Sequence, residues 1–169
     1  MNFTLSEDQR LIRDAAETFL ADCSDSAAVR RAMELPAGYD PTVWQRIGAE
    51  LGWCGIAIAE GHGGLGLGPV ELALVQEQAG RHLLCAPFFP TVAVAATVIQ
   101  QMGTEAAMAA LLPEIAAGSL RIGVPLPTAE QEWLGAARAL RARREEGQWR
   151  LDGPLRHVAS AEGAEALLV

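Results

Sequence analysis

Apolar residues recur at helical spacing over the first two thirds of the chain. Ser6 and Gln9 have the arrangement of a capping box, in which each side chain satisfies a free backbone donor at the start of a helix. An apolar stripe with steps of one, three and four follows, and this spacing places its members on one helical face. We therefore expect a first helix whose buried face carries Leu11, Ile12, Ala15, Ala16, Phe19 and Leu20.

Five further helices are expected from the same spacing and from their end signals. Asp40 before Pro41 has the order of a cap and a first-turn proline, and Thr104 can cap the last helix. Pro113 lacks a backbone N–H, so we expect it to interrupt that last helix before Gly118 ends it. The expected ranges are 27–33, 41–51, 70–79, 91–102 and 104–118.

The period of the pattern changes after Ser119. Residues 137–143 and 148–151 alternate apolar and charged side chains around a Glu-Glu-Gly-Gln turn, which predicts an antiparallel hairpin, and residues 166–169 are typical of another strand. We expect a mainly α chain with a C-terminal antiparallel β portion, an α+β fold. A helical domain would occupy 1–119 and the start of a β domain 120–169. About four or five strands are few for a closed or packed sheet, so this β domain is expected to be incomplete.

The charge of the chain excludes one class of function. A net charge of -8 and a pI near 4.8 argue against nucleic-acid binding, because phosphate binding needs a clustered positive field. The basic cluster is followed at once by Glu145 and Glu146, which cancel most of its local field. We interpret it as a solvated strand face rather than a binding patch. Its members are Arg138, Arg141, Arg143 and Arg144.

The cysteines and the N-terminus bear on the cellular compartment. Cys23, Cys54 and Cys85 are odd in number and lie 31 residues apart in each step, far from any metal-ligand spacing. We expect reduced thiols that fill the core, and no metal site. The N-terminus lacks the apolar region of a signal peptide, and the weakly polar stretch 86–99 is shorter than a membrane span. The sequence predicts a soluble, cytoplasmic protein.

A glycine motif invites a nucleotide-binding interpretation, which we reject. Gly61, Gly63 and Gly66 match the spacing G-x-G-x-x-G after a possible strand. The helix of a dinucleotide site starts within the glycine run, whereas Gly68 and Pro69 place it beyond the run. The acidic residue of that fingerprint, about 20 residues further on, is also missing. These glycines therefore predict a tight structural turn.

A longer segment around these glycines resembles a known family. Residues 44–68, WQRIGAELGWCGIAIAEGHGGLGLG, resemble the acyl-CoA dehydrogenase segment in which a helix ends at Leu-Gly-Trp before Pro-Glu-x-x-Gly-Gly-x-Gly. Upstream, FTLSEDQRLIRDAAETFLAD is similar to the family's first helix. Downstream come a helix that ends at Gly80 and Arg81, and the segment TEAAMAALLPEIAAGS. The resemblance covers essentially the whole chain, and it implies the family's N-terminal helical domain followed by the start of its middle β domain.

The resemblance implies a flavin enzyme of fatty acid metabolism, with FAD as its cofactor and an acyl-CoA as its substrate. In the family, a carboxylate takes the α-proton of the acyl group and the flavin N5 accepts the β-hydride. That carboxylate lies in a C-terminal helical domain, so we expect the catalytic base to lie outside this chain and the chain alone to be inactive. A homo- or hetero-oligomer of acyl-CoA dehydrogenase subunits is also implied.

The family's first flavin motif, Leu-Thr-Glu-Pro, aligns with Leu126, Pro127, Thr128 and Ala129. In the family, the backbone and hydroxyl of this motif hold the pyrimidine edge of the flavin. The resemblance therefore implies flavin contacts by Leu126 and Thr128. Pro127 departs from the motif, because it removes a backbone donor from that edge.

The second flavin motif, Trp-Ile-Thr-Asn, aligns with His157, Val158, Ala159 and Ser160. The resemblance implies flavin contacts by His157, Val158 and Ser160. The ring over the flavin would be an imidazole, which can stack or donate a hydrogen bond, although a histidine on a strand is also a common structural residue. The threonine hydroxyl near N5 is lost here. Ser160 either replaces it or faces the opposite way, because a shift of one residue reverses a strand side chain.

An acyl channel is the second site that the resemblance implies. Val92, Ala95, Ala96 and Ile99 share one face of the helix expected at 91–102, and in the family a neighbouring helix lines the fatty chain. Ordinary core packing explains the same stripe. Both interpretations stay open for these four residues.

Two other functions remain as alternatives. The chain can be a non-catalytic partner subunit of a heteromeric acyl-CoA dehydrogenase, one that keeps the fold but has lost flavin contacts. The altered motifs at 126–129 and 157–160 favour this hypothesis. A helical interaction module without enzymatic role needs only amphipathic helices, but it leaves the ordered resemblance unexplained.

Overall fold

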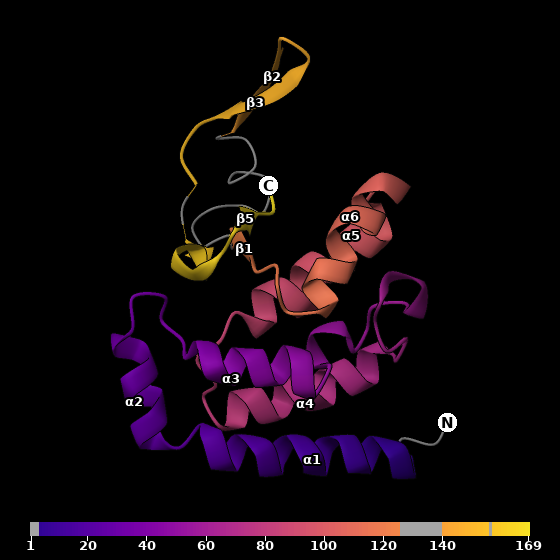
Figure 1. Cartoon of the computed structure of the whole chain (residues 1–169), viewed down its shortest axis with the longest axis vertical. Helices are drawn as coiled ribbons and strands as arrows, with labels where there is room; N and C mark the ends of the chain where they lie inside the picture. Colours follow the sequence, from indigo (N-terminus) through magenta and orange to yellow (C-terminus); the bar gives the residue numbers. More distant parts are fainter. Residues whose placement is uncertain (1–3, 126–139, 156) are drawn as a thin grey trace.

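A computed structural model describes residues 4–125, 140–155 and 157–169 of the chain. Its helical part is followed by a small β part, and α1 packs against α4 while α5 packs against α6 (Figure 1). This order confirms the fold class expected from the sequence. The helices are α1 (Glu7–Cys23), α2 (Ser26–Glu34), α3 (Pro41–Gln45), α4 (Pro69–Arg81), α5 (Ala96–Met102) and α6 (Glu105–Ala116).

Short helical segments of other types join or extend these helices. The π-helix η1 (Arg46–Glu50) continues α3, and the π-helix η4 (Phe89–Ala95) leads directly into α5. The 3-10 turns among the described residues are η2 (Trp53–Gly55), η3 (Glu60–His62) and η5 (Ala161–Gly163). The possible strand before the glycine run is therefore wrong, because η2 and turns occupy that segment.

The helix starts lie where their end signals predict. The Gln9 backbone N–H donates to the Ser6 hydroxyl at 3.1 Å, and the Ser6 N–H donates to the Gln9 side-chain oxygen at 3.0 Å. The Asp40 carboxylate accepts from the Thr42 N–H at 2.8 Å. Each pair satisfies backbone donors that the first helical turn leaves free. The predicted capping box and proline start are confirmed.

The predicted interruption at Pro113 is wrong. The helix α6 runs through Pro113 without a break and ends at Ala116. A proline inside a helix costs about 3 kcal/mol, because it removes a hydrogen bond and crowds the preceding turn. Leu112 and Ile115, on either side of it, have no exposed surface, and their burial offsets that cost.

The β part contains a three-stranded sheet in the order β4-β1-β5. Strand β1 (Ile122–Pro125) pairs antiparallel with β4 (Val158–Ala159) and parallel with β5 (Ala166–Leu167). The parallel pairing differs from the wholly antiparallel arrangement that the sequence predicts. It arises because the chain passes from β4 through η5 to the other edge of β1 before β5 begins.

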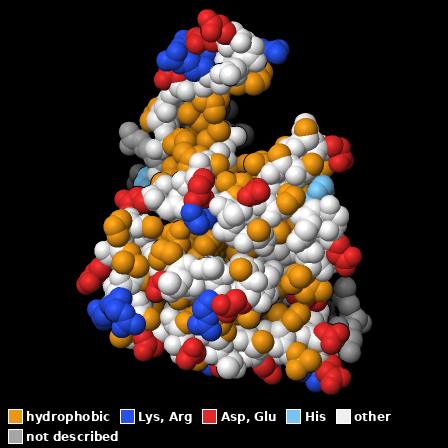
Figure 2. Space-filling view, in the orientation of Figure 1, with side chains coloured by type: hydrophobic (Ala, Val, Ile, Leu, Met, Phe, Trp, Pro, Cys, Tyr) orange, Lys and Arg blue, Asp and Glu red, His pale blue; other side chains and the backbone are white. Residues whose placement is uncertain are grey.

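A separate hairpin, β2 (Arg141–Glu145) and β3 (Gln148–Asp152), projects away from the helices (Figure 1). Its two-residue turn has φ of 50° at Glu146 and 83° at Gly147, the left-handed values that a tight hairpin turn requires. The predicted hairpin is confirmed for these strands, and residues 137–139 of its expected first strand lie outside the described residues. Figure 2 shows basic and acidic side chains mixed at its tip, as expected for a solvated face.

Two clusters of buried side chains lie in the part of the chain that the structure describes. The first lies among α1, α3, η1 and α4, around Trp44, Ile47 and Trp53. The second joins α5 and α6 to the first strand of the sheet, because it contains Ile122 and Val124 of β1. The central strand of the sheet is therefore packed directly on the helical part, and this contact sets the position of β4 as well.

Candidate functional site

The candidate flavin residues that the structure describes lie on and beside β4. Val158 belongs to this strand and is half-buried, opposite Pro125 of β1. His157 precedes the strand with an exposed side chain and a φ of 54°. Ser160 follows it, half-buried, with a φ of 58°. Two left-handed non-glycine residues thus bracket a strand of two residues, and such strained positions are often found where a ligand contacts the backbone.

The groups beside β4 fit the polar edge of a flavin ring. Within the described residues β4 pairs with β1 alone, so its other edge is open. An open edge offers backbone N–H donors and carbonyl acceptors in alternation. The imidazole of His157 and the hydroxyl of Ser160 stand at its two ends. Leu126 and Thr128, the other predicted flavin contacts, lie with Pro127 outside the described residues.

Contacts that the sequence did not predict fix the loop after β4. The Arg121 backbone N–H donates to a Glu165 carboxylate oxygen at 2.7 Å, and the Arg121 guanidinium forms an ion pair with the same carboxylate. The Arg121 Nε donates to the Gly163 carbonyl at 3.0 Å. A Cβ on Gly163 would lie 2.7 Å from the ring of Tyr39, so only glycine allows this approach. The loop is held against both the sheet and the helical core.

The four candidate acyl-channel residues lie in the packed core. Val92 is 2% exposed and belongs to the first core cluster. Ala95, Ala96 and Ile99 are at most 6% exposed and belong to the second cluster, which also contains β1 residues. In this structure their side chains contact protein atoms, as in ordinary core packing. The helix that carries them nevertheless lies directly beside the strand that leads to the first flavin motif.

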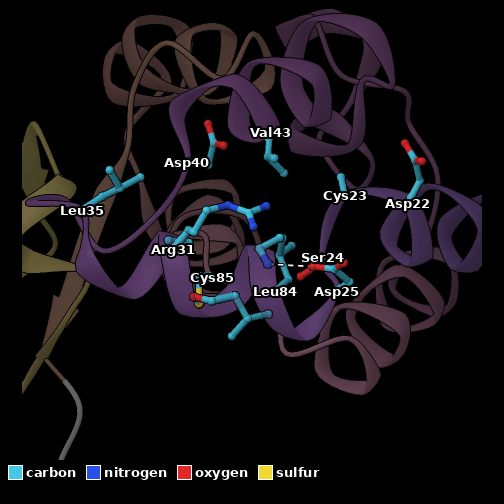
Figure 3. Close-up of a pocket in the computed structure, with 13 residues that line it drawn as sticks. Asp22, Cys23, Ser24, Asp25, Arg31, Leu35, Asp40, Val43, Leu84 and Cys85 are labelled. Carbon is cyan, nitrogen blue, oxygen red and sulfur yellow. Dashed lines mark hydrogen bonds between the residues drawn. The ribbon is translucent and has the colours of Figure 1, made fainter.

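A pocket of about 420 Å³ lies away from β4, among α1, α2, the start of α3 and the segment before η4. Figure 3 shows Asp40 and Val43 on one side of it, Leu84 and Cys85 on the other, and the side chain of Arg31 between them. Its lining mixes acidic groups, one arginine and apolar groups, so it favours no single class of ligand. None of its lining residues is a candidate flavin or acyl residue.

The cysteines differ from one another in a way that the sequence did not predict. Cys54 is fully buried, and this burial raises the pKa of its thiol to about 12. Cys23 and Cys85 are only partly buried and both line the pocket of Figure 3, so the prediction of three core fillers is wrong for these two. Burial also raises the pKa of the Cys23 thiol, while the nearby Arg46 opposes that effect. All three thiols are free.

In 4–125, 140–155 and 157–169, no group of three or more His, Cys, Asp or Glu residues is placed to hold a metal ion. No helix in these ranges is long and apolar enough to cross a lipid bilayer.

The fold defines a class of protein, an α+β chain whose helical part packs on the central strand of a small sheet. The family described as "Acyl-CoA dehydrogenase, N-terminal domain" matches residues 6–119. The acyl-CoA dehydrogenase fadE12 of Mycobacterium tuberculosis is 28% identical over 171 aligned positions, which cover 99% of this chain and 43% of that protein. The chain therefore belongs to the acyl-CoA dehydrogenase family.

Solved structures of the family match the chain over almost its whole length. A variant of the Tcur3481-Tcur3483 steroid ACAD is 32% identical with a TM-score of 0.83, and the match covers 98% of this chain and 45% of that chain. The ChsE4-ChsE5 complex from Mycobacterium tuberculosis, 22% identical with a TM-score of 0.85, has the same fold over 100% of this chain and 45% of its own. The chain thus spans less than half the length of these relatives.

Proposed function

We propose that the chain is the N-terminal portion of a flavin-dependent acyl-CoA dehydrogenase, which forms a double bond between the α and β carbons of an acyl-CoA thioester. One observation carries this proposal: the family match at 6–119 continues into the β part as a structural match at 32% identity over 98% of the chain. A bound FAD would supply the acceptor for the β-hydride, and a carboxylate base would take the α-proton. We assign the base to protein outside this chain.

The residues of this chain would bind and orient the reactants. His157, Val158 and Ser160 are proposed to contact the flavin through the open edge of β4, together with Leu126 and Thr128. The left-handed backbone at Ser160 supports this role, because it turns the residue out of the β4–β1 pairing. Alignment of the flavin with the acyl carbons accounts for much of the rate of such a reaction.

The helix beside β1 is proposed to line the acyl chain through Val92, Ala95, Ala96 and Ile99. These four side chains are small or branched, which suits the wall of a channel for a slender acyl chain. The helical domain (1–119) and the start of the β domain (120–169) would thus each contribute one wall of the site. We also propose that the protein acts in the cytoplasm, which its three free thiols support.

A second function is supported by the proteins that this chain resembles. Two similar structures carry the paired names Tcur3481-Tcur3483 and ChsE4-ChsE5, and the latter is described as a complex. The chain would then be a non-catalytic partner in a hetero-oligomer and would complete a site on another acyl-CoA dehydrogenase subunit. The departures from both flavin motifs support this alternative.

Flavin titration of the purified chain tests the first proposal. We expect weak FAD binding that changes the flavin fluorescence, and a further weakening of about tenfold when His157→Ala and Ser160→Ala are combined. Glu162→Gln, on the exposed turn after Ser160, is the matched control and should bind as the wild type does. Equal affinity of the double variant and the wild type would contradict the assigned flavin contacts.

Co-purification separates the two functions. A partner subunit should associate stably with a full-length acyl-CoA dehydrogenase and alter its flavin content or activity. A chain that remains monomeric beside such a protein, yet binds FAD through His157 and Ser160, favours the N-terminal portion of a single enzyme.

A further inference from the structure

Thr91 forms an unusual pair of hydrogen bonds with the first residue of β1. Its hydroxyl donates to the Ile122 carbonyl oxygen at 3.2 Å and accepts from the Ile122 backbone N–H at 3.0 Å. Thr91 has no exposed surface, and Ile122 is 3% exposed. One hydroxyl in η4 therefore satisfies both backbone groups of a buried strand residue, as a neighbouring strand normally does.

The direction of these bonds identifies which strand Thr91 replaces. Backbone groups of successive strand residues point to opposite edges of the strand. The carbonyl oxygens of Arg121 and Gly123 point toward β5. They accept hydrogen bonds from the backbone N–H groups of Ala166 and Leu168, at 3.4 and 3.0 Å respectively. The backbone of Ile122 therefore points to the other edge, the one that β4 occupies beside Val124. Thr91 therefore lies on the β4 edge of β1, at the position where the pairing of β4 with β1 would continue.

Strand β4 ends where Thr91 begins to pair. Val124 lies opposite Ala159, so a longer β4 would place Ala161 opposite Ile122. Instead, Ser160 takes a φ of 58° and Ala161 starts η5. Because the Thr91 hydroxyl already satisfies Ile122, the chain can leave the ladder at Ser160 without an unpaired group in the core.

We propose that Thr91 is a positioning residue that ends β4 at Ala159 and holds Ser160 in its left-handed conformation beside the flavin. This inference rests on the proposed flavin-binding function. Thr91 also belongs to the helical stretch that carries Val92 and Ala95, so the same hydroxyl fixes the spacing between the proposed acyl wall and the proposed flavin strand.

Matched substitutions separate the hydroxyl from the packing of the side chain. Thr91→Val keeps the shape and removes both hydrogen bonds, whereas Thr91→Ser keeps the hydroxyl. Ile47→Val is the control. Ile47 is fully buried in the first core cluster, whereas Ile122 belongs to the second, and the substitution removes one methylene. If Thr91→Val folds poorly, Thr91→Cys provides a graded replacement with a weak donor and acceptor.

The first measurement is the affinity of each 169-residue chain for FAD, together with the absorbance spectrum of the bound flavin. We expect Thr91→Val to weaken FAD binding about tenfold, which is about 1.4 kcal/mol, and to alter the spectrum. Thr91→Ser and Ile47→Val should stay within about twofold of the wild type. Equal weakening in Ile47→Val and Thr91→Val would overturn the proposal, because it would trace the effect to general stability.

The second measurement is amide hydrogen exchange without flavin. Thr91→Val should speed exchange at 122–124 and 158–161 and leave α1 and α4 as protected as in the wild type. If the wild-type chain binds no FAD, the proposed function fails on that result alone, and exchange still decides the role of Thr91. Unchanged exchange at 158–161 in Thr91→Val would overturn it.

Discussion

The indole Nε1 of Trp44 donates a hydrogen bond to the carbonyl oxygen of Gly118 at 2.8 Å. Trp44 is 3% exposed, and Gly118 has a φ of 74° just after the end of α6. A Cβ on Gly118 would lie 3.2 Å from the Cα of Gly48, so this residue type permits the close crossing of η1 and the α6 terminus. The bond thus fixes the point from which the chain enters β1.

Trp44→Phe should lower the free energy of unfolding by about 2 kcal/mol or more. The change removes the donor to a partly buried carbonyl and leaves a small cavity. Urea denaturation followed by circular dichroism measures the effect. Trp149→Phe is the matched control, because Trp149 is 70% exposed on the hairpin and its change should stay within about 0.5 kcal/mol. Equal effects of the two substitutions would contradict this role of Trp44.

Gly64→Ala should destabilise the protein by about 3 kcal/mol or prevent its folding. A Cβ at this position would lie 2.1 Å from the Ile58 carbonyl oxygen and 2.6 Å from the Ile58 Cβ, within a packed turn. Gly61→Ala is the control in the same run, because its Cβ would meet no atom within 4 Å. Thermal melting of both variants checks the prediction, and a wild-type melting temperature for Gly64→Ala would refute it.

The parts of the fold that the sequence predicts are those with local causes. The Ser6–Gln9 capping box and the Glu146–Gly147 turn involve residues within three positions of each other, so their signals are complete in a short stretch. The interruption expected at Pro113 is absent, because the burial of neighbouring side chains against other parts of the fold outweighs the local preference of proline against a helix. The same physical limit explains why the apolar run before the glycines was misread as a possible strand.

The glutamate that caps α4 should make stability depend on acid pH. The Gln9 amide donates to the Glu71 carboxylate at 2.8 Å, and together with backbone amides it holds the pKa of Glu71 below its usual value. A carboxyl with a lowered folded-state pKa adds stability above its unfolded pKa of about 4.3, and this stability is lost as pH falls through the folded pKa.

Glu71→Gln should therefore lose less unfolding free energy than the wild type when pH falls from about 5 to about 3. Urea titrations at each pH measure the difference. Glu77→Gln, an exposed change on the same helix, should retain the wild-type slope. A wild-type slope in Glu71→Gln would show that this carboxylate gains nothing from its contacts in the folded state.

Cys54 should resist thiol reagents until the protein unfolds. Burial raises its pKa to about 12, so at pH 8 only about one thiol in ten thousand is the reactive thiolate, and no reagent reaches it. In a variant with Cys23→Ser and Cys85→Ser, labelling by a disulfide reagent should require denaturant at both pH 7 and pH 9. Rapid labelling of the native variant would contradict the buried position.

The candidate site was only partly accessible from the sequence. The resemblance named His157, Val158 and Ser160, and the structure places Val158 on β4 and the other two residues at its two ends. Thr91 and Ile122 are separated by 31 positions, and Arg121 and Glu165 by 44, so no periodicity or spacing links them. The arginine partner of Glu165 is recognisable only after the sheet has formed.

The central claim is that this chain carries flavin-orienting groups of an acyl-CoA dehydrogenase but not its base. Anaerobic mixing of the chain, FAD and a series of saturated acyl-CoA thioesters tests it directly, with the loss of oxidised-flavin absorbance as the readout. We predict that flavin fluorescence reports binding that depends on His157 and Ser160, while the oxidised-flavin absorbance persists with every thioester. Tight stoichiometric FAD together with rapid flavin reduction by this chain alone would contradict the account.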